Sequence, residues 1–332
     1  MTAQFDVLGI GNAIVDVIAR TEDDFLIKND LAKGSMRLID EPEAERLYKA
    51  MGPATIVSGG SAANTIVGIA SLGGKAAFIG KVKTDEVGKI FSHDIDAIGV
   101  SFKTAHAVDG PATARSFILV TPDGERTMNT YLGACQLLGP DDIDASSVEA
   151  ASITYLEGYL WDPAEAKKAF RKASEIAHKA GRKVALTLSD SFCVDRYRDE
   201  FRDLIRTRAV DIVLANEHEL KSLYETADFD TAVKAFREEA ALAVVTRSEK
   251  GSLTISSQGL IEAPAFPIEN LVDTTGAGDL FAAGYLFGLA RGATYETCAK
   301  LGAMAAAEVI QHIGARPEVR LKDLATENGL AL

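Results

Sequence analysis

The feature that most constrains the fold is an alternation of short β-type runs with longer helical segments along the chain. The helical segments at residues 61–72 and 85–98 are separated by β-type sequence, and the pattern continues through the second half. Such alternation is typical of an α/β fold built on a parallel sheet. The β-type runs lie at residues 7–10, 76–82, 184–188, 212–214 and 243–246.

Two segments, 14–40 and 107–135, break this alternation. Both are rich in Thr, Val and Ile with alternating polarity, and the second contains Pro-Asp-Gly at 122–124, a turn typical of hairpins. We expect them to form a small β-lid contributed by two distant parts of the chain. The predicted division is therefore an α/β core of residues 1–13, 41–106 and 136–332, with a discontinuous lid of residues 14–40 and 107–135.

Composition excludes several classes of protein. The 332 residues are 47% hydrophobic, which is ample for a large core. Thirty-five basic against 48 acidic residues give a net charge of −13, which argues against a nucleic acid or an anionic membrane as partner. We find neither a signal peptide nor an apolar run of the roughly 18 residues that a membrane span needs. Three cysteines without a CxxC motif favour a reducing, cytoplasmic location.

The strongest candidate for chemistry is the sequence DTTGAGD at residues 273–279, which follows a β-like run at 269–273 and opens an Ala- and Gly-rich helix. Glycines at a helix start leave the backbone N–H groups unshielded, which suits a phosphoryl oxyanion. Asp279 would lie in the first turn, where it could accept a proton from an attacking hydroxyl. The alternative is an ordinary helix start with acidic capping and glycines that allow close packing.

A second Gly-rich element, Gly59-Gly60, precedes the helical segment 61–72. Ser61 and Asn64 are three residues apart and would share one face of that helix. They could hydrogen-bond a polyhydroxylated substrate, or Ser61 could simply cap the helix.

The N-terminal Gly9-x-Gly11 follows a β-type run but lacks the third glycine of a dinucleotide-binding fingerprint, since Ile14 stands there. An NAD-dependent oxidoreductase is therefore disfavoured. Asn12 and Asp16 could together clasp vicinal hydroxyl groups, although an Asp within an apolar strand is often an edge residue.

Asn216 and Glu219 follow the apolar strand predicted at 211–215. Ligands gather beyond the carboxyl ends of parallel strands, and an amide with a carboxylate there suits Mg²⁺, which takes few protein ligands. The same spacing also serves as a helix cap. The sequence contains neither a Walker A loop nor an HExxH or GxSxG motif.

In this order the elements resemble the ribokinase-like, or PfkB, carbohydrate kinase family over essentially the whole chain. The sequence DTTGAGDLFAAG at 273–284 is highly specific for that family, and SGGSAANTIVGIASLGGKAAFIGKV at 58–82 resembles its other signature. The sequence GIGNAIVD at 9–16 is similar to the adenosine kinase branch. The resemblance implies a three-layer α/β/α domain with a central, mostly parallel sheet and a small β-lid.

The resemblance also implies the roles of residues. Asp279 would be the base that deprotonates the substrate hydroxyl, while the amides of Gly276, Ala277 and Gly278 would bind the γ-phosphoryl group of ATP. Asn216 and Glu219 match an element that organises Mg²⁺ through water, and the need for a monovalent cation stays open. The nucleotide would contact Asn216, Thr246, Thr275, Gly276 and Gly278. The ribose would contact Asn12, Asp16, Gly59, Gly60, Ser61 and Asn64.

Aromatic residues are candidates for stacking on a nucleoside base. These are Tyr159, Trp161 and Phe192, with Tyr131 as a further candidate, although isolated aromatics more often lie in a core. Arg126, in the predicted lid, matches an arginine that the family brings toward the phosphates.

We therefore expect ATP- and Mg²⁺-dependent phosphorylation of the 5′-hydroxyl of a purine ribonucleoside, adenosine first. The alternatives are guanosine or inosine, a free sugar such as ribose or fructose, or a non-catalytic nucleoside sensor. The expected partner is a small molecule, and the expected assembly is a monomer or a homodimer.

Overall fold

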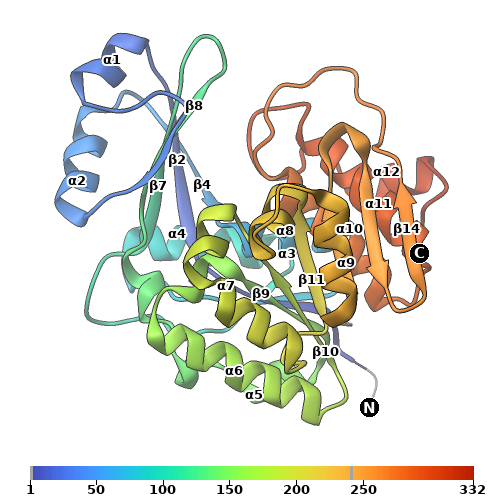
Figure 1. The fold of residues 1–332 in the computed structure, drawn as a ribbon. Helices are drawn as coiled ribbons and strands as arrows, with labels where there is room; N and C mark the ends of the chain where they lie inside the picture. The colour runs from blue at the N-terminus through green and yellow to red at the C-terminus, as the bar shows by residue number, and fades with distance from the viewer. Residues whose placement is uncertain (1–2, 240–241) are drawn as a thin grey trace.

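The computed structural model describes residues 3–239 and 242–332 and contains a large and a small sheet (Figure 1). The large sheet is parallel except at one edge, where β13 and β14 pair antiparallel. Its spatial order is β14-β13-β12-β11-β10-β9-β1-β5-β6. The strands are β1 (Phe5–Ile10), β5 (Ala76–Ile79), β6 (Ser101–Phe102), β9 (Ala151–Glu157), β10 (Lys183–Thr187), β11 (Ile212–Asn216), β12 (Leu242–Thr246), β13 (Ser252–Ser256) and β14 (Gly259–Ala263).

Helices cover both faces of the large sheet, because alternate strand residues point to opposite sides. Leu8 and Ile10 of β1 pack into one apolar layer, and Val7 packs into the other. The first layer contains α5 (Ala145–Glu149), α6 (Ala164–Lys179), α7 (Ser191–Arg206), α8 (Glu217–Leu223) and α9 (Phe229–Glu239). The second contains α3 (Ser61–Ser71), α4 (Glu86–Ala97), α10 (Ala277–Ala290), α11 (Tyr295–Val309) and α12 (Leu321–Glu327). The predicted three-layer α/β/α fold is confirmed.

The small sheet has the order β3-β8-β7-β2-β4 and stands beside the large one at the upper left of Figure 1. Two helices cover one of its faces, and their Leu26, Ala44 and Leu47 pack on Val17 and Phe117. The strands and helices are β2 (Ile14–Arg20), β3 (Met36–Leu38), β4 (Thr55–Gly59), β7 (Ala114–Val120), β8 (Arg126–Tyr131), α1 (Asp23–Lys28) and α2 (Glu41–Ala50).

The sequence boundary of this smaller unit needs a correction. Residues 41–59 were expected in the core, but β4 pairs antiparallel with β2 and α2 buries its apolar side on the small sheet. A local pattern of apolar residues does not show which of two sheets a helix or strand joins. The segments 14–40 and 107–135 do supply the other four strands of the small sheet.

The remaining structure is short or irregular. Residues 264–274 have no regular structure, so the β-like run predicted at 269–273 is wrong. Pro264 and Pro267 lack backbone donors, and the N–H groups of Val272 and Asp273 both donate to the Ile310 carbonyl instead of to a strand. Short 3-10 turns are η1 (Gly133–Leu137), η2 (Pro140–Asp142), η3 (Gly158–Trp161) and η4 (Ser248–Lys250).

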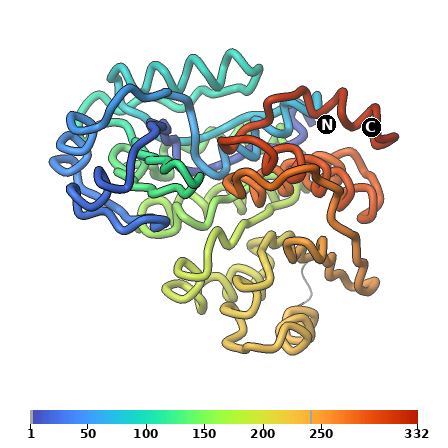
Figure 2. The backbone as a smooth tube through the Cα atoms, turned by 90° about the horizontal axis from the view of Figure 1, so that it is seen from above, coloured from blue at the N-terminus to red at the C-terminus, as the bar shows by residue number. Residues whose placement is uncertain are grey.

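Both ends of the described chain lie on the side away from the small sheet, as Figures 1 and 2 agree. Over residues 3–239 and 242–332, no helix is both long enough and apolar enough to cross a bilayer.

Helices α3 and α10 both start after a glycine in the left-handed region, Gly60 at φ 96° and Gly276 at φ 79°. A side chain is strained there. At Gly276 the space is also filled, because an added Cβ would lie 2.8 Å from the Ala315 Cα. Two residues later, a Cβ on Gly278 would meet nothing within 4 Å. The turn into α10 therefore depends on glycine at 276 and not at 278 for its fold.

We predict that Gly276→Ala lowers the free energy of unfolding by about 1–3 kcal/mol, because both the backbone and the neighbouring Ala315 resist a Cβ. Gly278→Ala is the matched control and should unfold at or slightly above the wild-type denaturant midpoint, since alanine favours a helix. Denaturant unfolding of both variants is the measurement. Equal midpoints for the two variants would contradict this account of the turn.

Candidate active site

A cleft of about 1450 Å³ lies between the two sheets. It is lined by residues at the carboxyl ends of the large-sheet strands, among them Asn12, Glu157 and Asn216, and by Ile14 and Asp16 of the small sheet. After β1 the chain builds β5 and β6 on one side, and β9 then returns to the other side of β1. Open α/β sheets bind ligands beyond the carboxyl ends of the strands at such a reversal of strand order.

Glu157 organises the floor of the cleft at this point of reversal. Its carboxylate, on a side chain 1% exposed, accepts hydrogen bonds from Asn12 Nδ2 (2.5 Å), Asn12 N (3.3 Å) and Ala62 N (2.9 Å). Burial raises the pKa of Glu157 to about 7. One buried carboxylate therefore joins β1, β9 and the start of α3. Sequence reasoning missed Glu157, although an acid at the end of an apolar strand was a usable signal.

Asp279 lies in the first turn of α10 and faces α3. Ser61 Oγ donates to its Oδ1 (2.6 Å), and Asn64 Nδ2 donates to its Oδ2 (3.1 Å). Burial raises the pKa of Asp279 to about 6, although both hydrogen bonds favour the carboxylate. Ser61 and Asn64 do share one face of their helix, and here that face holds Asp279.

The start of α10 has unshielded backbone donors. Its N-cap is a glycine without a capping side chain, and among the described residues the N–H groups of Gly276 and Gly278 have no acceptor. The Ala277 N–H donates to the Thr274 carbonyl (3.2 Å). Free N–H groups and the positive end of the helix dipole together attract an anion.

Asp273 holds the loop before α10. Its carboxylate accepts from Thr275 N (3.0 Å), Thr275 Oγ1 (2.7 Å) and Gly314 N (3.0 Å). Burial opposes ionisation, but these hydrogen bonds and the nearby Arg126 lower the pKa of Asp273. Arg126 of β8 forms an ion pair with it, and the two side chains are 8% and 7% exposed. In this structure Arg126 therefore ties the small sheet to the loop and does not line the cleft.

Asp16 points from β2 into the cleft, close to Gly59, where any side chain would collide with its carboxylate. Burial raises the pKa of Asp16 to about 6, against the opposing charges of Arg316 and Arg126. Arg316 donates to Ser58 Oγ (2.5 Å) and Asn64 Oδ1 (3.3 Å). Sequence reasoning missed Arg316, because no local motif marks a residue that reaches the site from a C-terminal loop.

Asn216 and Glu219 bond to each other. Asn216 Nδ2 and N donate to Glu219 (2.6 and 3.0 Å), and Glu219 N donates back to Asn216 Oδ1 (2.9 Å), which is a helix cap. Both also line the cleft, as do Thr246 and Thr275. Burial raises the pKa of Glu219 to about 7. Within the described ranges, no group of three or more His, Cys, Asp and Glu residues could hold a metal ion.

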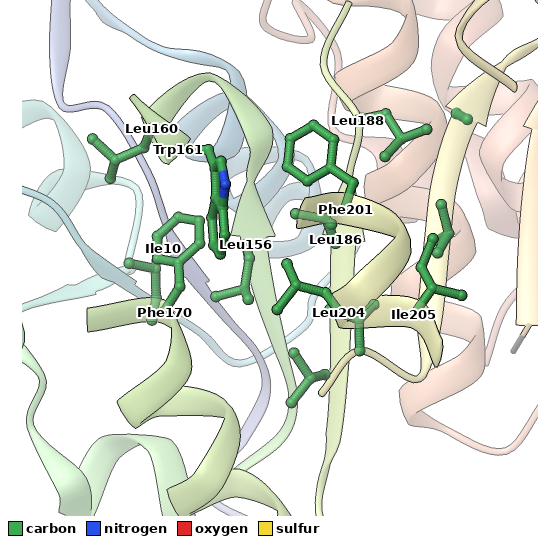
Figure 3. Close-up of a cluster of buried hydrophobic side chains, with 14 of the residues drawn as sticks. Ile10, Leu156, Leu160, Trp161, Phe170, Leu186, Leu188, Phe201, Leu204 and Ile205 are labelled. Carbon is green, nitrogen blue, oxygen red and sulfur yellow. The ribbon is translucent and has the colours of Figure 1, made fainter. Parts of the chain in front are cut away.

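Trp161 is wrong as a substrate contact. Its ring is fully buried between Phe170 and Phe201 in the helical layer, as Figure 3 shows, and Nε1 donates to Glu200 (2.9 Å). The turn η3 directs this side chain away from the cleft. Tyr131 is likewise buried, in the apolar core of the small sheet.

Phe192 and Tyr159 do line the cleft. Phe192 is 67% exposed, with the Arg196 guanidinium 4.6 Å from its ring centre, and the Tyr159 hydroxyl donates to the Ser189 carbonyl (3.1 Å). The small sheet adds aliphatic side chains to the same cleft. These are Met36, Leu38, Ile118 and Met128. The cleft thus has a polar floor and an apolar wall, which suits a ligand that carries hydroxyls on one part and a flat apolar ring on another.

Comparison with known proteins gives one consistent family. The model of the pfkB family carbohydrate kinases matches residues 34–320. The structure of a probable sugar kinase from Rhizobium etli CFN 42 is 53% identical with a TM-score of 0.93, covering 99% of this chain and 100% of that one. The structure of adenosine kinase from Sinorhizobium meliloti is 55% identical with a TM-score of 0.92, covering 98% and 100%.

A curated relative is adenosine kinase of Saccharomyces cerevisiae, 27% identical over 338 residues, which span 95% of this chain and 96% of the yeast protein. The family match, the extent of these similarities and the site at the start of α10 agree. The chain therefore belongs to the pfkB family of carbohydrate kinases and is an ATP-dependent phosphotransferase with an alcohol group as acceptor.

Proposed function

We propose that this enzyme transfers the γ-phosphoryl group of ATP to the 5′-hydroxyl of adenosine. The observation that carries the proposal is the buried Asp279 carboxylate beside the free N–H groups of Gly276 and Gly278, at the edge of a cleft with a polar floor and an apolar wall. The 55% identity to the Sinorhizobium meliloti adenosine kinase supports a nucleoside as acceptor.

The nucleoside would bind with its ribose on the polar floor. Asp16 would accept from the 2′- and 3′-hydroxyls, beside Asn12. Gly59 and Gly60 would serve the ribose site indirectly, since the absence of their side chains leaves space for the Asp16 carboxylate and the Asn12 carbonyl. The base would lie against the rings of Phe192 and Tyr159 and the aliphatic wall of the small sheet. Ser61 and Asn64 would act on the ribose side while they hold Asp279 in place.

Asp279 would take the proton of the 5′-hydroxyl as its oxygen attacks the γ-phosphorus and ADP leaves. The amides of Gly276, Ala277 and Gly278 would donate to the transferring phosphoryl oxygens, where negative charge is spread in the transition state. Thr246 and Thr275 would contact the nucleotide. Arg126 would exchange Asp273 for the phosphates once ATP is bound, which would keep the small sheet closed over the reactants.

The residues present fit a magnesium ion held through water. Glu219 is 5% exposed and lines the cleft with Asn216, and burial and the nearby Asp190 charge raise its pKa, so a cation at this place would favour its ionised form. Magnesium commonly keeps several waters and binds few protein groups beside the phosphates. When bound with ATP, it would neutralise phosphate charge.

We also propose that the small sheet, with residues 41–59 included, acts as the lid. The enzyme would work on small molecules alone, as a monomer or homodimer in a reducing cytoplasm, where its three buried, free cysteines would stay reduced. It would bind neither a nucleic acid nor a membrane.

A panel assay tests the substrate. With Mg-ATP, ADP release should be fastest with adenosine among adenosine, guanosine, inosine, ribose and fructose, measured with and without potassium. Asp279→Asn should lower kcat by about 10²- to 10⁴-fold, the range that a general base contributes. Turnover of ribose or fructose alone would refute the nucleoside assignment and favour the sugar kinase alternative, in line with the Rhizobium etli relative.

The reaction should lose rate in acid. Because the pKa of Asp279 in the free enzyme is raised to about 6, its proton-accepting form is lost as the pH falls through that value. The kcat/KM for adenosine at pH 5 should therefore be at most about a tenth of its value at pH 7. Asp16, whose pKa is also raised to about 6, should add a rise in the adenosine KM over the same range. Circular dichroism at each pH controls for unfolding. A kcat/KM that stays flat from pH 7 to 5 would contradict the role of Asp279.

Phe192→Ala should raise the KM for adenosine about 2- to 12-fold through the loss of ring contact and leave the KM for ATP unchanged. Because Phe192 is 67% exposed, the thermal midpoint of the Phe192→Ala variant should stay near that of the wild type. Phe192→Trp keeps a ring and is the matched control. A higher KM for ATP with an unchanged KM for adenosine would contradict the proposal, because it would mean that Phe192 contacts ATP and not adenosine.

A further inference from the structure

The loop at residues 314–316, after α11, contacts Asp273 directly and reaches Asp279 through Asn64. Gly314 N donates to Asp273 (3.0 Å), and Ala315 packs so closely on Gly276 that no Cβ fits between them. The next residue, Arg316, extends to the other side, toward α3 and β4. The loop thus contacts the turn at the start of α10, which has free N–H groups, and helix α3, whose Ser61 and Asn64 donate to Asp279.

Arg316 makes two hydrogen bonds to buried partners. Its Nη1 donates to Ser58 Oγ (2.5 Å) at the end of β4, and its Nε donates to Asn64 Oδ1 (3.3 Å) in α3. Ser58 is 1% exposed and Asn64 4% exposed. Ser58 is itself fixed, because its N–H donates to Asp94 (3.0 Å). The guanidinium is therefore anchored on one side and acts on Asn64 on the other.

The Asn64 side chain has two unlike ends, an oxygen that only accepts and an NH₂ that only donates. Its orientation is set by what its neighbours offer. Arg316 can only donate, so it takes the oxygen, and Nδ2 is left to donate to Asp279 (3.1 Å). With the amide reversed, Oδ1 would face a carboxylate oxygen and Nδ2 would face a guanidinium, and both contacts would be repulsive.

We propose that Arg316 is a positioning residue, which fixes the orientation of the Asn64 amide so that it donates to Asp279 and keeps that base ionised and aimed at the acceptor hydroxyl. The proposal rests on the role of Asp279 as the base. Arg316 itself does not line the cleft, so it acts through Asn64.

Charge adds to the effect of orientation. Asp16 and Asp279 are acidic neighbours in the cleft with Glu157 beneath them, and Arg316 and Arg126 are the cations that act on Asp16. Burial lowers the pKa of Arg316 to about 10, so it stays charged at neutral pH, helped by Asp16 and Asp94. Removal of Arg316 takes a positive charge away from Asp16 and an oriented donor away from Asn64. The first loss should raise the pKa of Asp16, and the second, through Asn64, the pKa of Asp279.

Steady-state kinetics of Arg316→Gln test the proposal. We expect kcat to fall at least about tenfold with the KM for ATP unchanged, and the acidic limb of the kcat profile to move to higher pH. Arg316→Lys keeps the charge beside Asp16 but loses the planar guanidinium that bonds Ser58 and Asn64, so kcat should stay low while the KM for adenosine stays nearer the wild-type value. Arg320→Gln, in an exposed residue of the same segment, is the matched control. A wild-type kcat and pH profile in Arg316→Gln would overturn the proposal.

A double-mutant cycle separates positioning from general damage to the fold. If Arg316 works through Asn64, the double variant Arg316→Gln/Asn64→Ala should be about as slow as Asn64→Ala alone. Effects that multiply would mean that Arg316 acts by another route and would overturn the proposal.

A spectroscopic readout needs no turnover. The side-chain ¹⁵N resonances of Asn64 should titrate with Asp279 in the wild type and lose that titration in Arg316→Gln. An Asn64 signal that titrates alike in both would overturn the proposal even with unchanged folding. A wild-type enzyme that phosphorylates none of the panel would instead count against the proposed substrate, and the resonances would still decide the role of Arg316.

Discussion

The rest of the site depends on keeping the Asp279 carboxylate ionised where two helix starts meet. Burial raises its pKa to about 6, and the hydrogen bonds of Ser61 and Asn64 oppose that rise. Both donors come from the first turn of α3, so α3 and α10 must begin side by side. Glycines in the left-handed region, Gly60 and Gly276, allow these starts.

Buried carboxylates and their partners fix the strands, helices and loops around Asp279 relative to one another. Glu157 joins β1 and β9 to the start of α3 at the point where the strand order reverses. Asp273 fixes the turn before α10 and, through Arg126, couples it to the small sheet. The Arg126 and Asp273 side chains are nearly closed to solvent, so removal of either one would leave an uncompensated charge. The position of the small sheet relative to the start of α10 is thus part of the electrostatics of the site.

Local sequence patterns predicted the features of the fold and site that depend on residues close together in the chain. The alternation of β-type and helical runs located five strands of the large sheet and the helices α3 and α4, and the spacing of Ser61 and Asn64 placed them on one face. Glu157, Arg316 and the pairing of Asp273 with Arg126 depend on contacts between distant segments, which no local pattern encodes. The prediction that Trp161 stacks on a base was wrong for a related reason. An aromatic side chain after a strand can point either toward the cleft or into the helical layer, and the local sequence does not show which. The strand predicted at 269–273 was wrong because the prediction considered only the β-propensity of these residues and not the two prolines that precede them.

The central claim is that Asp279 and the start of α10 address the 5′-oxygen and the transferring phosphoryl group. A crystal structure with adenosine and a non-hydrolysable ATP analogue tests it most directly. The account predicts the 5′-oxygen within hydrogen-bonding distance of Asp279, about 2.6–3.2 Å, and the γ-phosphate on the amides of Gly276 and Gly278. A nucleoside bound with its 5′-oxygen turned away from Asp279, or a γ-phosphate placed elsewhere in the cleft, would contradict it.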